Sequence, residues 1–413
     1  MRAVVVGAGV AGAAAAIALR RIGWQVTVYE AYQDPAGPYG SFVSLAVNGL
    51  RGLAALGCLP AVQQAGFPVD RQRMWSAGGR LLGDVPRGRR ADDPLTSVTL
   101  NRSDLVSTLR QAALASGAEI VTGHRVAAAD LAAADADLLV GADGIWSAAR
   151  PWIDPAAPKP RYAGLYTASG VSDLGSAIGD AGFEPGTFNM TFGRQGAFIH
   201  LPAPDGTVWW SAQVSAAVAP QPAEITLHVL QALVGADELP GRILRMARAG
   251  ISTTLIHVLD PVPVQAGRRT VLIGDAAHPV GAGQGAAMAI EDAVILARQL
   301  GGLLDSDVSH SDNSVGATTA GARVDQAITA FVGLRGDRLG KLAKSAARNR
   351  DAKTAGPLAA RLRDVVMPVT FNRFYEKATG WLYDFDPGML PGPGARQGLS
   401  GRGIPADTGS GAD

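Results

Sequence analysis

The chain has 413 residues, with 37 basic and 36 acidic side chains, so its formal net charge is +1. This balance leaves no basic excess for a phosphate backbone and argues against a nucleic-acid partner. The single cysteine, Cys58, excludes an internal disulfide framework and fits a reducing cytoplasm, and the six histidines show no metal-ligand spacing. Glycine and proline form about one residue in five, well above average, which indicates disordered segments or many tight turns.

The N-terminal segment predicts a strand, a glycine turn, a helix and a second strand. Residues 3–19 form an uncharged run that superficially resembles a signal peptide, but this run is mostly alanine and glycine, with regularly spaced glycines. Residues 2–7 predict a buried parallel strand, residues 11–22 a helix that Gly23 ends, and residues 25–30 the next strand. Together they make one βαβ unit.

Two later segments repeat the pattern of an apolar strand followed by a glycine turn. Residues 137–144 and residues 269–275 both fit it, and the second predicts a long helix over residues 285–300. Between them, residues 162–215 are rich in Thr, Phe and Trp and alternate apolar with polar positions over residues 188–192. We expect a mostly antiparallel sheet there, inserted as a second domain into the first.

Two segments have the composition of irregular chain. Residues 305–322 are rich in Ser, Gly and Thr and predict a disordered surface loop. Residues 388–413 are rich in Gly and Pro and predict a floppy tail.

The first glycine turn has the G-x-G-x-x-G spacing at Gly7, Gly9 and Gly12. Such glycines permit a tight turn, a close approach of a pyrophosphate to bare backbone, and close helix–strand packing. Glu30 ends the following strand, where a carboxylate can accept both ribose hydroxyls of adenosine. This context favours dinucleotide binding over a plain αβ turn.

The other two turns read GADGIWSAAR over residues 141–150 and GDAAHP over residues 274–279, with GQG at residues 283–285. Each repeats the strand, glycine turn and helix start of the first motif. The carboxylate of Asp275 can bond a ribityl or ribose hydroxyl. Glu291-Asp292, on the helix that follows, predicts helix surface or a helix-to-helix bond rather than catalysis.

These three motifs, in this order, resemble the group A flavoprotein monooxygenases, the aromatic hydroxylases that include para-hydroxybenzoate, salicylate and urate hydroxylases and tetracycline-inactivating enzymes. The resemblance extends to about residue 351 and implies an α/β fold: a Rossmann-like FAD-binding domain, an inserted, mostly antiparallel β-sheet substrate domain, and C-terminal helices. The expected segments are 1–70, 98–160 and 265–350 for the FAD domain, 71–97 and 161–264 for the sheet domain, 351–387 for C-terminal helix and 388–413 for the tail.

The resemblance also implies FAD and NAD(P)H as cofactors and assigns residues to FAD. Residues 39–48 fall where the family places the loop beside the isoalloxazine. Arg102 matches a family arginine near the FAD phosphates, its alternative being an exposed arginine at a helix start. The full set expected at FAD is Gly7, Gly9, Ala11, Gly12, Glu30, Arg102, Val126, Asp143, Arg150, Asp275, Gly283, Gln284, Gly285 and Ala286.

Two departures from the family pattern stand out. Four residues, 279–282, separate His278 from the GQG turn, where many relatives have about six. The usual hairpin over residues 126–137 has shrunk to a connection rich in Ala and Asp.

On the substrate side, His200 is the one titratable group on an otherwise apolar strand, either an acid/base or phenol-orienting group or a hydrogen-bonded core histidine. His278 is expected to be structural rather than basic. The aromatic cluster over residues 374–385 is expected to pack the last helix or to cover the substrate entrance. Pocket-lining candidates, equally suited to sheet core, are Met190, Phe192, Trp210 and Gln213.

The reaction that the resemblance implies inserts one oxygen atom of O₂ into a small aromatic or polycyclic metabolite through a C4a-hydroperoxyflavin. Alternatives are Baeyer–Villiger or epoxidising chemistry on the same scaffold, a flavin reductase or dehydrogenase without oxygen transfer, and a non-catalytic flavoprotein. We expect a cytoplasmic monomer or homodimer without a membrane span, a bound metal or a nucleic-acid partner.

Overall fold

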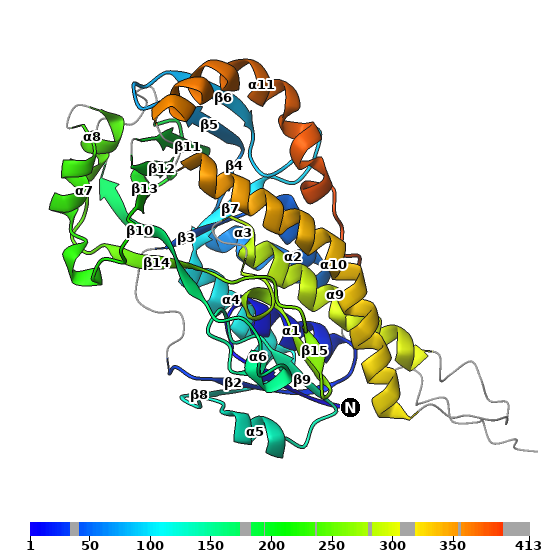
Figure 1. Cartoon of the computed structure of the whole chain (residues 1–413). Helices are drawn as coiled ribbons and strands as arrows, with labels where there is room; N and C mark the ends of the chain where they lie inside the picture. Colours follow the sequence, from blue (N-terminus) through cyan, green and yellow to red (C-terminus); the bar gives the residue numbers. More distant parts are fainter. Residues whose placement is uncertain are drawn as a thin grey trace, which may run out of the picture.

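A parallel sheet occupies one end of the molecule and carries the predicted βαβ unit (Figure 1). The computed structural model describes residues 1–33, 41–173, 183–193, 195–235, 238–279, 283–305, 319–353 and 357–390. All neighbours in this sheet are parallel except β15 and β16, the pair at one edge, which is antiparallel. Its strands, in spatial order, are β15 (Ala266–Gly267), β16 (Thr270–Leu272), β9 (Leu138–Gly141), β1 (Arg2–Val6), β2 (Gln25–Glu30) and β8 (Glu119–Thr122).

The uncharged N-terminal run forms β1 and helix α1 (Val10–Arg21). Its alanines are buried because α1 packs closely against α9 (Gly285–Asp305) and α4 (Arg102–Ala115). Gly23 ends this segment with φ +87°, where the Gly23 N–H bonds the Arg20 carbonyl and the Trp24 N–H bonds the Leu19 carbonyl. Within the described residues, no helix is both long and apolar enough to cross a membrane.

The second sheet is mostly antiparallel, as the sequence predicts, with one parallel pair, β11 and β5. It combines segments that are far apart in the chain. Its seven strands, in spatial order, are β14 (Ser252–Val258), β10 (Arg161–Asp173), β13 (Thr207–Ser215), β12 (Gly196–Pro202), β11 (Thr187–Phe192), β5 (Arg71–Trp75) and β6 (Leu81–Pro86).

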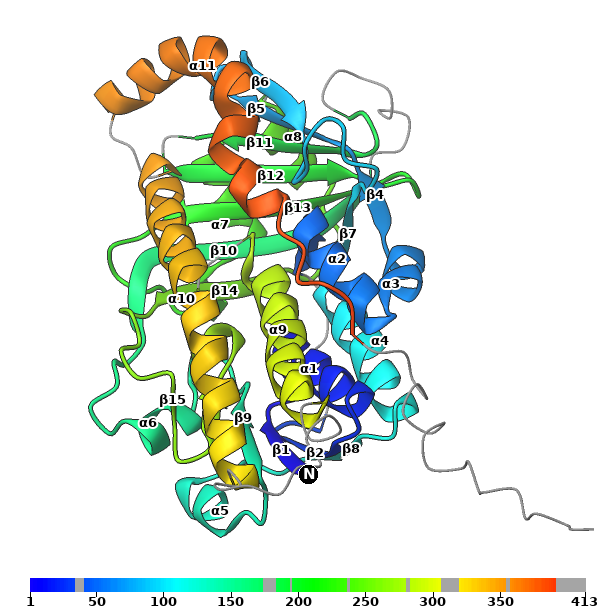
Figure 2. The same cartoon turned by 90° about the vertical axis from the view of Figure 1, so that its right-hand side faces the viewer.

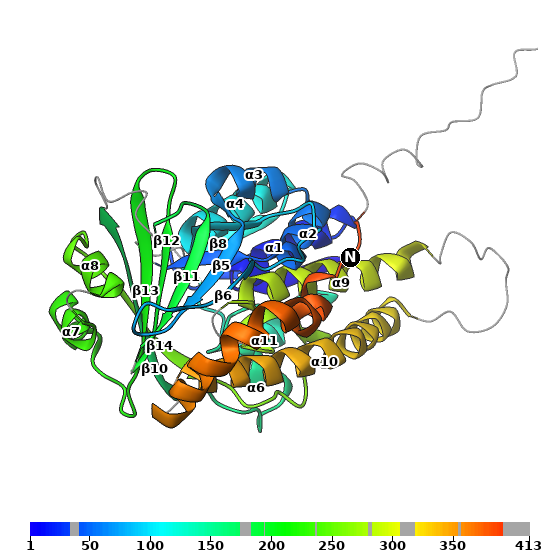
Figure 3. The same cartoon turned by 90° about the horizontal axis from the view of Figure 1, so that it is seen from above.

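Helices cover one face of this sheet, and the rest of the molecule lies on the other (Figure 3). We call the first the back face: Trp210, Phe198 and their neighbours pack there against α7 (Leu227–Leu233) and α8 (Leu239–Arg245), beside the short helix η2 (Pro222–Glu224). We call the other the front face. A small sheet, β3 (Phe42–Leu45), β7 (Ser97–Asn101) and β4 (Phe67–Val69), contributes to that side.

The remaining helices tie the two sheets together. Helix α10 (Ala320–Lys353) runs beside α9, and α11 (Pro357–Tyr383) lies over β6 (Figure 2). Helices α2 (Val47–Leu56) and α3 (Leu59–Ala65) join β3 to β4. The short helices α5 (Ala128–Ala133) and α6 (Ala149–Ile153) flank β9, and η3 (Gly274–Ala276) follows β16. The shortened connection over residues 126–137 thus contains a helix, α5.

Two expectations of irregular chain need correction where the structure describes them. Helix α10 already begins at Ala320, inside the predicted loop 305–322, while residues 306–318 lie outside the described residues. Leu390, inside the predicted tail, is buried in the core of the parallel-sheet domain, and the Pro387 carbonyl accepts a hydrogen bond from Arg298. Residues 391–413 lie outside the described residues.

Candidate functional site

The first glycine turn is shaped by backbone contacts that leave no room for a side chain at two of its three glycines. Gly7 has φ +96°, and a Cβ there would lie 2.5 Å from the Ala142 carbonyl oxygen. A Cβ on Gly12 would lie 1.8 Å from the Gly7 carbonyl oxygen, so Gly12 permits the close packing of α1 on the turn. At Gly9 a Cβ would meet nothing within 4 Å. Gly9 therefore leaves open space at the start of α1.

Helix α1 begins in that open space. No side chain caps it, and its first turn, within the described residues 1–33, contains no acidic residue. The first N–H groups of a helix have no partner within the helix, and the helix dipole adds partial positive charge there. The turn is therefore suited to an anionic group such as a pyrophosphate.

Glu30 is held at the end of β2 by the glycine turn itself. Its Oε2 accepts a hydrogen bond from the Ala8 N–H at 2.7 Å, and its Oε1 accepts one from the Tyr32 N–H at 3.0 Å. Each carboxylate oxygen has a second lone pair for a hydroxyl donor. Val126, just beyond β8, is buried in the same core cluster as Val6, so it packs beside this end of the sheet.

The second motif places Asp143 and Arg150 in different roles. Asp143 Oδ2 accepts two backbone N–H groups at the start of α6, at 2.7 and 3.1 Å. Its Oδ1 is buried and has no hydrogen-bond donor among the described residues. Arg150 is buried and donates to the carbonyls of Ile145 and Ala276, which ties this turn to the third motif. Burial lowers the pKa of Arg150, and the charge of Asp143 opposes that shift.

The third turn lies against the first. A Cβ on Gly274 would lie 2.9 Å from the Cβ of Ala11 in α1. The next residue, Asp275, has an exposed side chain. Protein atoms crowded around its carboxylate raise the pKa of Asp275, while the charges of His278 and Arg102 lower it. Arg102, which begins α4, therefore shares its electrostatic environment with Asp275.

The predicted flavin-side turn leads into α9. Gly283 has φ +120°, and a Cβ there would meet nothing within 4 Å. Gln284 precedes α9, while Gly285 and Ala286 form its first turn. A Cβ on Gly285 would lie 3.4 Å from Asp275 Oδ1, so this turn faces the same space as Asp275. Residues 280–282, the shortened part of the loop, lie outside the described residues, as do residues 39–40 of the loop predicted beside the isoalloxazine.

These residues fit FAD. The space at Gly9 in front of the α1 N-terminus is open, and a buried acceptor, Asp143 Oδ1, has no donor among the described residues. All three motifs meet at the ends of β1, β9 and β16, which are adjacent strands of one parallel sheet. A ligand bound there lies outside the carboxyl ends of the strands, as expected for this architecture.

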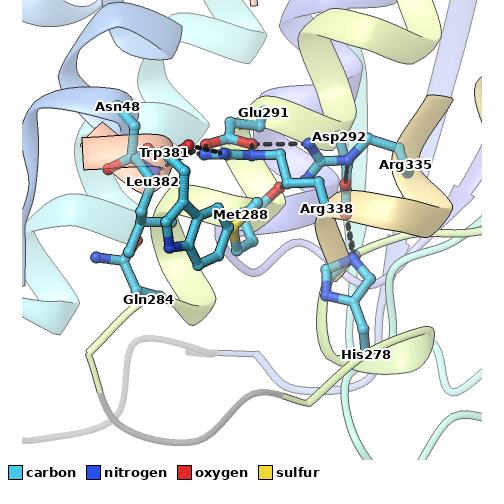
Figure 4. A network of polar contacts seen from close by, with 11 residues as sticks. Asn48, His278, Gln284, Met288, Glu291, Asp292, Arg335, Arg338, Trp381 and Leu382 are labelled. Carbon is cyan, nitrogen blue, oxygen red and sulfur yellow. Dashed lines mark hydrogen bonds and ion pairs between the residues drawn. The ribbon is translucent and has the colours of Figure 1, made fainter. Parts of the chain in front are cut away.

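Next to the third glycine turn lies a fully buried pair of acidic residues, Glu291 and Asp292 on α9 (Figure 4). Arg335 of α10 contacts both: its Nε donates to Asp292 at 2.7 Å and its NH1 to Glu291 at 2.7 Å. Asp292 also accepts the Gly274 N–H at 2.9 Å and contacts His278 Nε2 at 2.6 Å. The interpretation of Glu291-Asp292 as a helix-to-helix bond is confirmed, and Asp292 additionally fixes the third turn.

The charges in this cluster balance one another. Burial alone would raise the pKa of Asp292, but His278 and Arg335 together hold it below its ordinary value. Burial likewise opposes the charge of Arg335, yet Asp292 and Glu291 raise the pKa of that guanidinium. His278 contacts the buried carboxylate of Asp292 and so helps to hold the third turn on α9, which is a structural role.

The cluster continues from Glu291 towards the flavin-side loops and the last helix (Figure 4). Arg338 donates to both oxygens of Glu291 and to the carbonyls of Trp381 and Leu382 at the end of α11. Asn48, at the start of α2, donates through Nδ2 to Glu291 at 2.7 Å and to Gln284 at 3.3 Å. Glu291 thus joins three separate parts of the chain. Asn48 ends the loop 39–48 that is expected beside the isoalloxazine, whereas no signal in the sequence singled out Arg335 or Arg338.

The seven-stranded sheet separates the predicted substrate residues by face. Met190 and Phe192 belong to the front-face cluster. Gln213 lies opposite Ala197 in the strand register, so it also points to the front; its Oε1 is buried and has no hydrogen-bond partner among the described residues. Trp210 belongs to the back face, packed with residues of α7 and α8.

His200 lies directly opposite Trp210 in the strand register and is fully buried, with its ring 6.1 Å from that of Phe183, another back-face residue. The structure therefore places neither Trp210 nor His200 on the front face. Trp209, the neighbour of Trp210, points to the front and contacts Phe42 and Phe67 from the small sheet. Sequence alternation could have identified Trp209 only if the register of the strand were known.

Comparison with known proteins places the chain among flavoproteins. Residues 1–311 match the family model described as an FAD binding domain. The chain is 31% identical over 317 residues to an aurachin C monooxygenase/isomerase of Stigmatella aurantiaca, covering 72% of this chain and 79% of that protein. It is 30% identical over 319 residues to an FAD-dependent urate hydroxylase of Klebsiella pneumoniae, covering 72% and 80%. Klebsiella pneumoniae HpxO, solved with FAD and uric acid, has the same fold, with a TM-score of 0.72 at 22% identity over 92% of this chain and 95% of that one.

Proposed function

The chain belongs to the FAD binding domain family, and from this premise we propose that it is an FAD-dependent monooxygenase that accepts electrons from NADH or NADPH and transfers one oxygen atom of O₂ to an aromatic or polycyclic metabolite. The observation that carries the proposal is the convergence of three glycine turns at one edge of the parallel sheet, in a chain whose second sheet has an apolar, aromatic front face. The named relatives are monooxygenases and hydroxylases, which supports oxygen transfer rather than reduction alone.

Each turn has a distinct task toward FAD. The Gly9 backbone and the α1 N-terminus would bind the pyrophosphate, and Glu30 the adenosine ribose. Asp143 Oδ1, Asp275 and Arg102 would bind the central part, where the guanidinium offsets phosphate charge. The backbone of Gly283 to Ala286 would face the ring. FAD, once bound and reduced, supplies the oxygen-activating chemistry.

The protein's own contribution is to orient the substrate and exclude water. Met190, Phe192 and Trp209 belong to the apolar front-face cluster and would pack against a flat aromatic ring. Gln213 Oε1 offers a buried acceptor for a hydroxyl or amino donor on the substrate. His200 has no part in this proposal, because it lies on the other side of the sheet.

The same reasoning extends to assembly and compartment. Every residue assigned above comes from one chain, so a monomer or a homodimer would contain complete sites.

Cys58 is buried, and burial raises the pKa of its thiol against the charge of Arg21, which makes it a poor nucleophile. We therefore propose the cytoplasm, where NADH and NADPH are available and a single thiol stays reduced.

The test is reduction of the purified holoprotein. We expect NADH or NADPH to bleach the visible flavin band under anaerobic conditions, and an aromatic substrate to stimulate aerobic oxidation of the nucleotide. Protein that purifies without flavin would contradict the cofactor assignment. A second outcome would be bound flavin that neither NADH nor NADPH reduces, whichever compound of an aromatic panel is added. This result would contradict the assignment of NADH or NADPH as electron donor and would favour a non-catalytic flavoprotein.

A further inference from the structure

Arg87, at the front face, has no carboxylate partner among the described residues, unlike the arginines near it. Arg87 follows β6 and is half-buried, and its guanidinium carbon lies 3.9 Å from the ring centroid of Phe188. Its NH1 donates to Gln72 Oε1. Its Nε is buried and makes no hydrogen bond to the described residues. The edge of the guanidinium formed by Nε and NH2 therefore donates no hydrogen bond to the described residues.

The arginines around it are all paired with carboxylates. Arg51 pairs with Asp93, Arg89 with Asp70, and both Arg71 and Arg73 with Asp84. Among the described residues, no carboxylate lies within 4 Å of Arg87. Asp70 is joined to Arg87 only through the backbone, where the Arg87 N–H donates to the Asp70 carbonyl, and the Asp70 side chain pairs with Arg89. Tyr383 also lies near Arg87; burial raises the pKa of Tyr383, and the charge of Arg87 opposes the shift. A half-buried cation without a counter-charge has lost part of its hydration, so an anionic ligand can pair with it at a smaller desolvation cost.

Arg87 also stands at the border of the substrate surface. Phe188, under its guanidinium, lies opposite Gln72 on one side and belongs to the front-face cluster with Leu201 and Trp209. The next residue, Gly88, accepts a hydrogen bond from the Val47 N–H at 3.1 Å, immediately before Asn48. Arg87 thus lies between the front face and the loop predicted beside the flavin ring.

We propose that Arg87 is a specificity-determining residue that binds an anionic group, a carboxylate or a phenolate, on the aromatic substrate. This inference rests on the proposed function and narrows its substrate class. The unused Nε and NH2 edge of a guanidinium matches the two oxygens of a carboxylate, and such a pair is stronger than a neutral hydrogen bond. The ring attached to the anion would then lie against the apolar front face.

The binding test uses the FAD-loaded protein and matched probes, benzoate and salicylate against benzamide and salicylamide, followed by the change in flavin absorbance. We expect the wild type to prefer the carboxylates. Arg87→Gln should weaken carboxylate binding by about 10- to 100-fold and leave amide binding nearly unchanged, while Arg87→Lys keeps part of the preference. Arg89→Gln, which removes an arginine already paired with Asp70, should change neither class.

A second readout separates ligand binding from a structural role. In the ligand-free holoprotein, Arg87→Gln should lower the melting temperature less than Arg51→Gln, because Arg51 has a protein counter-charge and Arg87 has none. Equal destabilisation by the two variants, equal weakening of both probe classes, or no carboxylate response in the wild type would overturn the inference. These outcomes leave flavin content and reduction by NADH or NADPH intact, so they are distinguishable from failure of the proposed function.

Discussion

The Asn48 side-chain amide donates a hydrogen bond to Glu291 at 2.7 Å, and both side chains are fully buried. The two residues lie 243 positions apart in the chain. This bond connects the start of α2, next to the predicted flavin-side loop, to the helix that begins at the GQG turn. Because Glu291 also neutralises Arg335 and Arg338, the geometry of the cofactor loops depends on a charge balance within the core.

Removing the charge of Glu291 should therefore destabilise the protein strongly. Glu291→Gln leaves Arg335 paired with Asp292 alone and Arg338 with no carboxylate among the described residues, so we expect the free energy of unfolding to fall by about 3–5 kcal/mol. Urea denaturation of the holoprotein measures it. Glu119→Gln, on the surface, is the matched control and should lie within about 0.5 kcal/mol of the wild type. A Glu291→Gln variant as stable as this control would contradict the role of the cluster.

Two glycines of the same motif should fail in different ways. Gly9→Glu places a carboxylate in open space, so the protein should fold but purify without FAD. Gly12→Ala places a Cβ against the Gly7 carbonyl oxygen, so the fold itself should be destabilised, by about 1–3 kcal/mol or more. Flavin absorbance per protein and the melting temperature separate the two effects. Gly78→Glu, at another open glycine, is the control, and a Gly9→Glu protein that retains FAD would refute the phosphate assignment.

Asp275 should show a conflict between stability and binding. Its folded pKa is raised above the unfolded value, so its ionisation costs stability once the pH exceeds the unfolded value of about 4. Apoprotein with Asp275→Asn should therefore be more stable than the wild type at pH 7, and the difference should vanish below pH ~4, where the wild-type carboxyl is protonated. The same variant should bind FAD more weakly. Denaturation across pH 3–8 checks the sign, which would be reversed if Asp275 were a purely structural anion.

Adjacent tryptophans should separate the two faces of the substrate sheet. Trp210→Ala empties part of the back-face core and should cost about 3–5 kcal/mol of stability. Trp209→Phe keeps an aromatic ring on the front face and should change KM for an aromatic substrate at little cost in stability. Steady-state kinetics beside thermal denaturation tests this. A KM change from Trp210→Phe as large as that from Trp209→Phe would show that the faces are wrongly assigned.

The glycine turns could be predicted because their requirement is local: a positive φ or a missing Cβ is set by a few neighbouring residues, as at Gly7 and Gly12. The α/β class followed from the same segments and is confirmed. The face of the sheet to which a side chain points is harder to predict, because a shift of one residue in strand register exchanges the faces of Trp209 and Trp210. The partners of Glu291 could not be predicted, since Asn48, Arg335 and Arg338 meet it only through the packing of α2, α9 and α10.

The high glycine content of the chain has two structural uses in the cofactor turns. Gly7 and Gly12 allow backbone segments to touch, Gly274 leaves room for the Cβ of Ala11, and Gly9 and Gly283 leave open space where a cofactor would bind. The segments at residues 305–322 and 388–413 are less uniformly irregular than their composition indicates, since α10 begins at Ala320 and Leu390 is buried in the core.

The fate of molecular oxygen tests the central claim most directly. The holoprotein is supplied with NADH or NADPH, an aromatic substrate that stimulates its oxidation, and ¹⁸O₂, and the product mass is measured. We predict a product that gains one ¹⁸O atom per molecule, with the second oxygen atom released as water. Nucleotide oxidation that yields only hydrogen peroxide and unlabelled organic compound would contradict monooxygenation and identify the protein as a flavin reductase.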